Sequence, residues 1–121
     1  ALIRGLIVDP STQLDAHVTS EVQNHLFENP FSTQTKRFSL SAINIMRGRD
    51  HGIPSYNEFR EFSGLKKATS FDDLVEIPIG VREALKKLYD DVNDIDAFTG
   101  GISETPLDGA ILGPTFSGIM L

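Results

Sequence analysis

Apolar residues recur at helical spacing in the first part of the chain. The pattern predicts a helix over residues 2–7 that ends before Asp9-Pro10, because the residue before a proline is disfavoured in a helix. A longer ladder of apolar residues at four-residue spacing predicts an amphipathic helix over residues 14–27. Its positions are Leu14, Val18, Val22 and Leu26. The polar residues 31–38 predict a loop.

Capping residues define two helices in the middle of the chain. Ser39 is a suitable N-cap for a helix over residues 40–50, and a Gly-Ile-Pro sequence then stops that helix. Ser55 can cap the next short helix, and Glu58 three residues later completes the sequence of a capping box.

The second half of the chain has one longer amphipathic pattern, over residues 79–89. We expect Val81, Leu85 and Leu88 to face inwards, and Glu83 to pair with Lys87 one turn later. The remaining segments are short. They are a helix over residues 71–76 capped by Ser70, a helix or turn over residues 94–98, loops at Gly100-Gly101 and Asp108-Gly109, and a final apolar segment over residues 116–121.

Strand-like alternation is nearly missing, so the pattern predicts an all-α fold of short helices with long connections. Short helices need partners to pack on, and long connections are unusual in a free-standing bundle. The pattern therefore favours a segment of a larger helical domain, with no internal domain boundary over residues 1–121.

Composition and charge narrow the possible functions. The chain has 121 residues, of which 40% are hydrophobic and 23% charged, a globular balance. The net charge of −6 argues against nucleic acid and anionic membranes as partners, and no apolar run approaches the roughly 20 residues of a membrane span. Cysteine is absent, which excludes disulfides and thiolate chemistry and favours a reducing compartment or a bacterial-type protein. The opening residues do not predict a signal peptide, and an opening without Met leads us to expect a piece of a longer protein.

The densest cluster of charged side chains lies at the end of the predicted 40–50 helix. Two arginines, an aspartate and a histidine share five positions between an apolar run and the Gly-Ile-Pro stop. The surrounding sequence fits the pattern N-x-x-R-x-R-D-H-G-[LI]-P-x-Y-N. The matching positions are Asn44, Arg47, Arg49, Asp50, His51, Gly52, Pro54, Tyr56 and Asn57.

This pattern resembles the signature near the C-terminal end of the animal haem peroxidase domain, in the myeloperoxidase-like or peroxidase–cyclooxygenase superfamily. Further segments resemble that family in the same order, so the resemblance covers nearly the whole chain. They are LIRGL at residues 2–6, the helix end at residues 25–27, YNEFREFSGL at residues 56–65, IDAFTGGISE at residues 95–104 and GPTF at residues 113–116. The family usually has cysteines at the position of Ser63 and near Gly118, which pair in animal members; here both are missing.

The resemblance implies a segment of an enzyme that uses hydrogen peroxide to oxidise a halide or a small organic donor. The family's distal histidine, catalytic arginine, calcium-binding loop and proximal iron-ligating histidine precede this segment and have no match in it. We therefore expect no catalytic residue and no metal ligand here, haem bound mainly by residues outside the segment, and no activity of the segment alone. Calcium is possible in the parent domain but not here. The expected partners are haem and the remainder of the domain.

Two alternatives to this interpretation concern function and compartment. The chain can be a non-catalytic helical scaffold or interaction module derived from the same fold. Secretion is typical of the family, whereas the absence of cysteine favours a bacterial-type or intracellular member.

Asn44 and Arg47 are the residues to which the resemblance assigns cofactor binding. They are three positions apart, so a helix places them on one face. By resemblance, Asn44 accepts a hydrogen bond from the proximal histidine and thereby tunes the iron, and Arg47 contacts a haem propionate. The alternative is an asparagine that satisfies backbone groups and an arginine that reaches to solvent.

The other polar residues of interest are better explained as scaffold. Arg49 and Asp50 can form an ion pair that locks the turn, and His51 sits where a helix dipole favours a cation. We expect His17 and His25 at the surface, and Tyr56 and Tyr89 in packing rather than radical chemistry. The acidic positions Asp90, Asp91, Asp94 and Asp96 lack the order of an EF-hand, so a solvated acidic loop is favoured over calcium binding.

Overall fold

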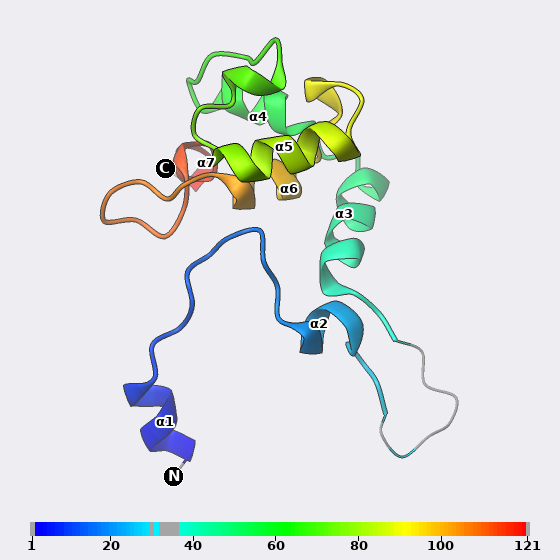
Figure 1. Cartoon of the computed structure of the whole chain (residues 1–121), viewed down its shortest axis with the longest axis vertical. Helices are drawn as coiled ribbons and strands as arrows, with labels where there is room; N and C mark the ends of the chain where they lie inside the picture. The colour runs from blue at the N-terminus through cyan, green and yellow to red at the C-terminus, as the bar shows by residue number, and fades with distance from the viewer. Residues whose placement is uncertain (1, 30, 32–36, 121) are drawn as a thin grey trace.

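The computed structural model describes residues 2–29, 31 and 37–120 of the chain. Within those residues it contains seven α-helices, two 3-10 helices and no named strand (Figure 1). The elements are α1 (Leu2–Val8), α2 (Ser20–Asn24), α3 (Leu40–Asp50), α4 (Tyr56–Phe62), η1 (Phe71–Asp73), α5 (Ile79–Leu88), η2 (Val92–Asp94), α6 (Ala97–Ser103) and α7 (Pro114–Met120). The predicted all-α fold of short helices is therefore confirmed.

The chain divides into a packed body, residues 55–120, and an extended arm, the described residues of 2–54. The body carries one apolar cluster between α4, α5 and the segments around η1 and η2 (Figure 1). Its buried members are Tyr56, Ala68, Leu74, Ile77, Leu85, Val92 and Ile95. The helices α1, α2 and α3 of the arm contain no buried residue, so the core belongs to the body alone.

The predicted helix over residues 14–27 is wrong in length, because only Ser20–Asn24 is helical. Residues 13–17 instead run along the body, where they line a hollow of about 290 Å³ together with Pro78 and Ile102. Leu26 pairs with Phe38 in an antiparallel bridge, with N···O distances of 3.3 and 3.2 Å. A short amphipathic helix forms only where its apolar face has something to cover. Residues 32–36 of the predicted loop lie outside the described residues.

Two of the predicted N-caps are confirmed. The Ser39 hydroxyl accepts a hydrogen bond from the Ala42 N–H at 3.3 Å, and Ser55 accepts one from the Glu58 N–H at 3.4 Å. The capping box is incomplete, since the Glu58 carboxylate accepts from Lys67 at 2.6 Å instead.

The 3-10 helix η1 is shorter than the predicted helix over residues 71–76. The Asp73 carboxylate accepts hydrogen bonds from the hydroxyl and N–H of Thr69 and from the N–H of Ser70. These bonds lower the pKa of Asp73 to about 2. A carboxylate satisfied by three donors at the N-terminus of η1 fixes the start of this turn without a longer helix.

Helix α5 confirms the predicted amphipathic helix but not all of its side-chain assignments. Leu85 is buried, and Val81 packs against the core, whereas Leu88 is 75% exposed. Glu83 contacts Lys86 at 3.4 Å rather than the predicted Lys87. Lys86 also reaches Asp72 at 2.7 Å, so one lysine links α5 to η1.

The predicted loop at Gly100-Gly101 is wrong, because both glycines lie inside α6. A Cβ atom on Gly100 would come within 2.2 Å of Tyr56 Cγ, and one on Gly101 within 2.2 Å of Phe116 Cζ. The two glycines therefore allow aromatic rings of α4 and α7 to pack directly on the α6 backbone. Close packing, rather than turn formation, explains why glycine occupies these positions.

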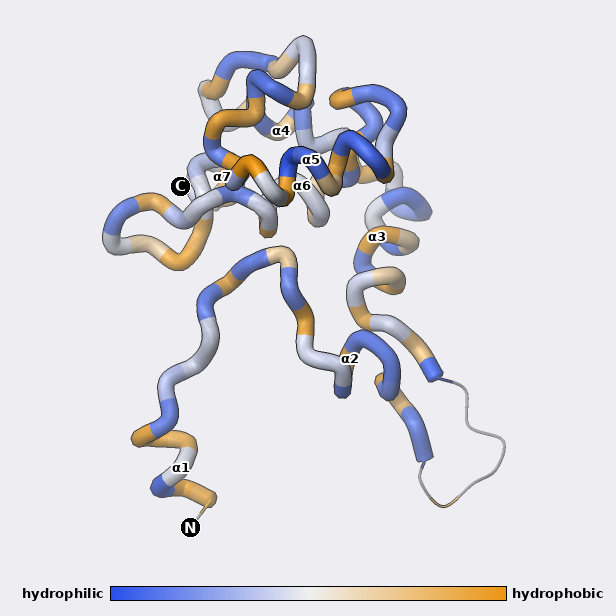
Figure 2. Tube along the Cα trace, viewed as in Figure 1, coloured by the Kyte–Doolittle hydropathy of each residue, from blue (hydrophilic) through white to orange (hydrophobic). Residues whose placement is uncertain are grey.

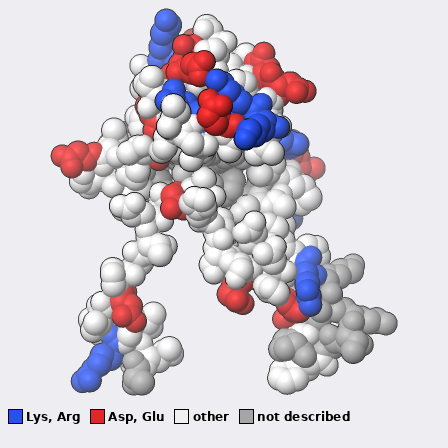
Figure 3. All heavy atoms as spheres, viewed as in Figure 1, with Lys and Arg blue, Asp and Glu red and all other residues white. Residues whose placement is uncertain are grey.

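Hydropathy and charge are distributed differently over the two regions. Apolar residues of α1 stand free of the body (Figure 2). Charged side chains gather over the α4 and α5 end of the body, while most of the remaining surface on this face carries none (Figure 3). In the part of the chain that the structure describes, no helix has the length and apolar character of a membrane span.

Candidate functional site

Helix α3 carries the two residues predicted to bind a cofactor, and it projects from the body towards α2 (Figure 1). Its C-terminal end is closed by local contacts. The Nδ1 atom of His51 lies 2.9 Å from the Arg47 carbonyl, and the Ile53 N–H donates to the Gly48 carbonyl at 2.9 Å. Gly52 takes the left-handed conformation with φ +67°, as the predicted helix stop requires. The scaffold interpretation of His51 agrees with this geometry.

An apolar cleft of about 490 Å³ opens between α3, α6 and α7. Asn44 and Asp96 are the polar side chains in its described lining. The apolar lining includes Ile45, Phe59, Phe98, Phe116, Ile119 and Met120. A cleft of this kind, apolar with a few convergent polar groups, is the usual form of a cofactor or ligand site.

Asn44 and Arg47 lie in successive turns of α3, and they differ in exposure. Asn44 is half-buried at the cleft, and Arg47 is exposed. Among the described residues, no side-chain hydrogen bond of Asn44 and no ion pair of Arg47 is formed. The same residues contain no group of three or more His, Cys, Asp or Glu side chains that could hold a metal ion. The hydrogen-bonding capacity of both side chains is therefore not used by any described residue.

The predicted ion pair of Arg49 with Asp50 is wrong, because Arg49 reaches across to Asp96 at the start of α6. Its Nε donates to Asp96 Oδ1 at 2.8 Å and its Nη2 to Oδ2 at 2.7 Å. Asp50 is exposed and its carboxylate lies 3.9 Å from His51. A bidentate contact needs the planar fork and the carboxylate to face each other, which adjacent residues on a helix cannot achieve.

Asp96 is held by a second polar contact, from the Tyr89 hydroxyl to Asp96 Oδ2 at 2.8 Å. The hydrogen bond from Arg49 lowers the pKa of Asp96, and the same contact raises the pKa of Arg49. Burial, together with the bond to Asp96, raises the pKa of Tyr89. Tyr89 thus has the packing role that the sequence predicted, with its hydroxyl as a structural donor.

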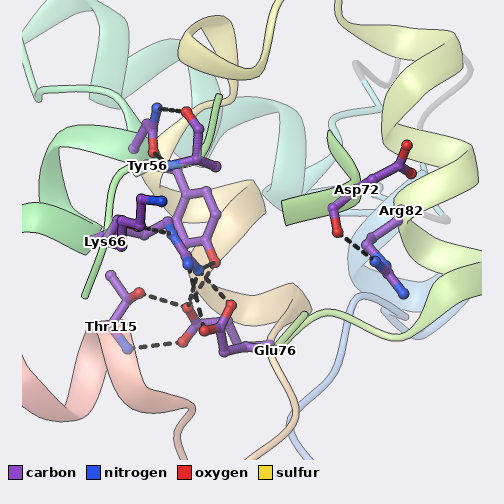
Figure 4. A network of polar contacts seen from close by, with 10 residues as sticks. Tyr56, Lys66, Asp72, Glu76, Arg82 and Thr115 are labelled. Carbon is purple, nitrogen blue, oxygen red and sulfur yellow. Dashed lines mark hydrogen bonds and ion pairs between the residues drawn. The ribbon is translucent and has the colours of Figure 1, made fainter. Parts of the chain in front are cut away.

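A buried polar network, absent from the sequence-based interpretation, connects α4, α6 and α7 (Figure 4). Glu104 accepts from the Tyr56 hydroxyl at 2.7 Å, from the Thr115 hydroxyl at 2.5 Å and from the Thr115 N–H at 2.9 Å. Arg60 donates to Glu76 at 2.6 Å and to the Tyr56 oxygen at 3.2 Å.

The members of this network are removed from water and satisfied by one another. The side chains of Arg60 and Glu104 are 4% and 0% exposed. Burial and the bond to Glu104 raise the pKa of Tyr56, and the Arg60 hydrogen bond, against the effect of burial, lowers the pKa of Glu76. Tyr56 packs in the core, as predicted. The four-residue spacing of Tyr56 and Arg60 places them on one face of a helix, which the sequence could have shown. Their acidic partners, Glu76 and Glu104, lie too far along the chain to be predicted from spacing.

Asn57 is a second buried polar residue with a complete set of contacts. Its side-chain amide donates to the Ala68 carbonyl at 2.9 Å and to Asn93 Oδ1 at 2.7 Å, and its oxygen accepts from the Ala68 N–H at 2.8 Å. Asn93 in turn bonds Asp91. Asn57 therefore braces the body from inside, whereas Asn93 and Asp91 lie at its surface.

Ser63 and Gly118, the positions to which the resemblance assigns the family's cysteine pair, lie next to each other. A Cβ atom on Gly118 would stand 2.7 Å from Ser63 Cβ. The Ser63 hydroxyl donates to the Thr115 carbonyl at 2.8 Å, which joins α4 to α7. A hydrogen bond thus joins α4 to α7 at the positions where the resemblance implies a cysteine pair.

The remaining histidines belong to the arm. His25 contacts Glu28, which also pairs with Arg37 at 2.8 Å. The His17 N–H donates to Asp15 at 2.7 Å. Both histidines are exposed, as predicted.

Comparison with known proteins gives consistent similarities. The family model described as "Animal haem peroxidase" matches residues 1–121. Peroxinectin A of Dictyostelium discoideum is 36% identical over 95% of the chain, and Peroxidase skpo-1 of Caenorhabditis elegans is 38% identical over 97%. The chain covers 21% and 17% of those two proteins, so it spans about a fifth of their length or less.

Solved structures agree with the sequence similarity. The structure of Peroxidase A from Dictyostelium discoideum superposes with a TM-score of 0.85, at 35% identity, over 98% of the chain and 22% of that protein. A fatty acid alpha-dioxygenase of Arabidopsis thaliana superposes with a TM-score of 0.61, at 30% identity, over 69% of the chain and 13% of that protein.

Proposed function

The chain belongs to the animal haem peroxidase family, and on that premise we propose that the protein containing it uses hydrogen peroxide to oxidise a halide or an organic donor at a haem. Haem, when bound, supplies the redox chemistry, and the protein sets its orientation and electronics. The contribution of this segment is support of the proximal side of the cofactor through Asn44 and Arg47.

The proposal rests on the position of the Asn44 side chain. A half-buried side-chain amide lies at an apolar cleft without a hydrogen-bonding side-chain partner among the described residues. The side-chain oxygen of an asparagine is a hydrogen-bond acceptor, and at the wall of an apolar cleft it can serve a donor that enters the cleft. The Asn44 oxygen can accept the N–H of an imidazole from the remainder of the domain. Such a bond holds a metal-ligating histidine in one orientation and one tautomer.

Arg47 supports the same face of α3 with a positive charge. Its guanidinium is exposed and has no carboxylate partner in the described chain. Arginine forms bidentate, charge-assisted bonds with carboxylates, and haem carries two propionates of that chemistry. The role of Arg47 is therefore to seat the cofactor, while Asn44 acts on the iron ligand.

The decisive experiment measures the haem reduction potential of the full-length protein. An Asn44→Asp substitution places a negative charge on the imidazole hydrogen bond, favours the ferric state and should lower the potential. Asn24→Asp makes the same chemical change at the exposed end of α2 and serves as the control. An unchanged or raised potential in Asn44→Asp would rule out contact with the proximal ligand.

Haem retention separates the two residues. Asn44→Ala removes the acceptor, and we expect haem affinity or activity to fall by about 10–100-fold, the usual range for partners of metal ligands. Arg47→Ala should weaken haem binding with a smaller change in the iron spectrum, and Arg4→Ala on α1 is its matched control.

The alternative is a non-catalytic scaffold that kept the fold. We expect the chain by itself to show no specific peroxidase turnover, because the residues resembling the distal and proximal sites lie outside it. Haemin added to the chain should oxidise a phenolic donor no faster than haemin with serum albumin. A full-length protein that binds no haem would favour the scaffold.

A further inference from the structure

An ion pair between Arg49 of α3 and Asp96 at the start of α6 joins these two helices beside Asn44. Arg49, five residues after Asn44 on the same helix, forms a two-point contact with the Asp96 carboxylate at 2.8 and 2.7 Å. Asp96 also lines the apolar cleft together with Asn44. The Asp96 carboxylate therefore joins α3, which carries Asn44, to α6 on the opposite side of the cleft.

Asp96 is itself fixed to the body from several directions. The Tyr89 hydroxyl donates to it at 2.8 Å, and its backbone pairs with Ser55 in an antiparallel bridge. Its carbonyl accepts the N–H of Gly100 at 2.9 Å, which begins α6. The Asp96 side chain is 13% exposed, against 65% for Arg49. The acid is thus the fixed half of the pair, and the arginine brings α3 to it.

Among the described residues, the Arg49–Asp96 contact is the only ion pair between α3 and the body. None of the α3 residues is buried. Successive residues of an α-helix are about 100° apart, so a rotation of α3 through part of that angle changes the direction of the Asn44 amide. A point charge would hold α3 near the body and leave it free to rotate, whereas the guanidinium fork bonds the carboxylate in one orientation.

We propose that Asp96, through its bidentate contact with Arg49, is a positioning residue that sets the rotation of α3 and so aims Asn44 at the proximal ligand of the haem. The proposal rests on the function proposed above for Asn44. Because Arg49 is mostly exposed, the pair contributes little to global stability, and its main effect is on orientation. In this proposal Arg49 and Asp96 act on the cofactor through the position of Asn44.

The test uses the full-length haem protein and resonance Raman spectroscopy of the iron–histidine stretch in the ferrous state. Asp96→Asn removes the charge, and Arg49→Lys keeps the charge but removes the fork. We expect both to shift or broaden the band in the direction that Asn44→Ala does, by less than Asn44→Ala. Combined with Asn44→Ala, neither should add a further shift, since the path runs through Asn44. Asp96→Glu should restore part of the wild-type band.

The matched control is Asp72→Asn, which breaks the exposed pair with Lys86 and should leave the band unchanged. Far-UV circular dichroism identifies any variant that fails to fold, and Arg49→Lys, at an exposed side chain, is the variant expected to fold normally. If Asn44→Ala moves the band while Asp96→Asn and Arg49→Lys do not, the positioning role is wrong and the function of Asn44 stands. If Asn44→Ala itself leaves the band unchanged, the proposed function fails, and the positioning role fails with it.

Discussion

The body and the arm have similar apolar content along the sequence, but among the described residues only the body buries part of it in a core. In the body, apolar residues enclose a core and a buried polar network joins three helices. In the arm, Leu2, Ile3, Leu6 and Ile7 are 74–80% exposed. Apolar patches of this kind mark surfaces that another part of a protein covers. The body is organised by its own contacts, whereas the arm is organised for contacts beyond the described chain.

The candidate site lies where these two regions meet. Asn44 and Arg47 are on α3, which belongs to the arm, while Asp96 and most of the cleft belong to the body. A helix with free hydrogen-bonding groups on one side and an anchor on the other can present those groups to a cofactor held by the rest of a domain. The comparison therefore predicts that substitutions of buried residues in the body strongly lower stability. Substitutions in the arm should have small effects on stability or effects of the opposite sign.

The largest effect should come from Arg60→Ala in the buried network. The substitution leaves Glu104 buried and removes the partner of Glu76. Breaking a buried ion pair from one side costs about 3–5 kcal/mol, and we expect a value near 3 kcal/mol because Glu76 keeps some access to water. Urea denaturation measures this change. Lys86→Ala, which breaks an exposed pair, should cost less than about 1 kcal/mol, and equal losses would contradict the contrast.

The second effect compares glycines in the two regions. Gly100→Ala places a methyl group 2.2 Å from the Tyr56 ring carbon and should destabilise the body by about 1–3 kcal/mol. Gly5→Ala on α1 places a methyl group 3.7 Å from an Asp9 side-chain oxygen, an ordinary contact distance, and should stabilise the helix by up to about 1 kcal/mol. Thermal unfolding and helicity by circular dichroism test the opposite signs. A stabilising Gly100→Ala would disprove the packing role of that glycine.

The third effect concerns association of the chain by itself. The exposed apolar face of α1 should make the isolated chain self-associate or only marginally stable. A Leu6→Ser, Ile7→Ser double substitution should shift sedimentation towards the monomer. Val75→Ser, at a single residue of the body that is 75% exposed, is the control and should change little. A chain that is monomeric and also unfolds cooperatively at high temperature before any substitution would refute the contrast.

The smallest effect is the pH dependence of the contact between the regions. Arg49 lowers the pKa of Asp96 below its ordinary value of 3.8. A group with a lowered folded-state pKa adds stability that is present above the ordinary value and is lost as pH falls through the folded value. The contact between α3 and α6 should therefore persist at neutral pH and weaken only below about pH 3.8. NMR titration of the Asp96 carboxyl carbon checks this, and Arg49→Gln should raise its pKa.

The sequence by itself determined what depends on neighbouring residues and on motif order. The helical class, the Ser39 and Ser55 caps, the stop at Gly52 and the amphipathic α5 all follow from contacts within a few residues. The ordered motifs also identified the family, which the family model and the relatives bear out. The roles of Asn44 and Arg47 stay predictions that rest on that resemblance.

Only the tertiary structure decided which distant groups meet. Arg49 pairs with Asp96 rather than with Asp50, Gly100 continues a helix beneath the Tyr56 ring, and the ladder from residue 14 to residue 27 shortens to α2. The guanidinium of Arg49 and the ring of Tyr56 contact residues that lie more than forty positions away along the chain, at Asp96 and Gly100. Local periodicity cannot encode such partners, because it measures only the few residues on either side of a position.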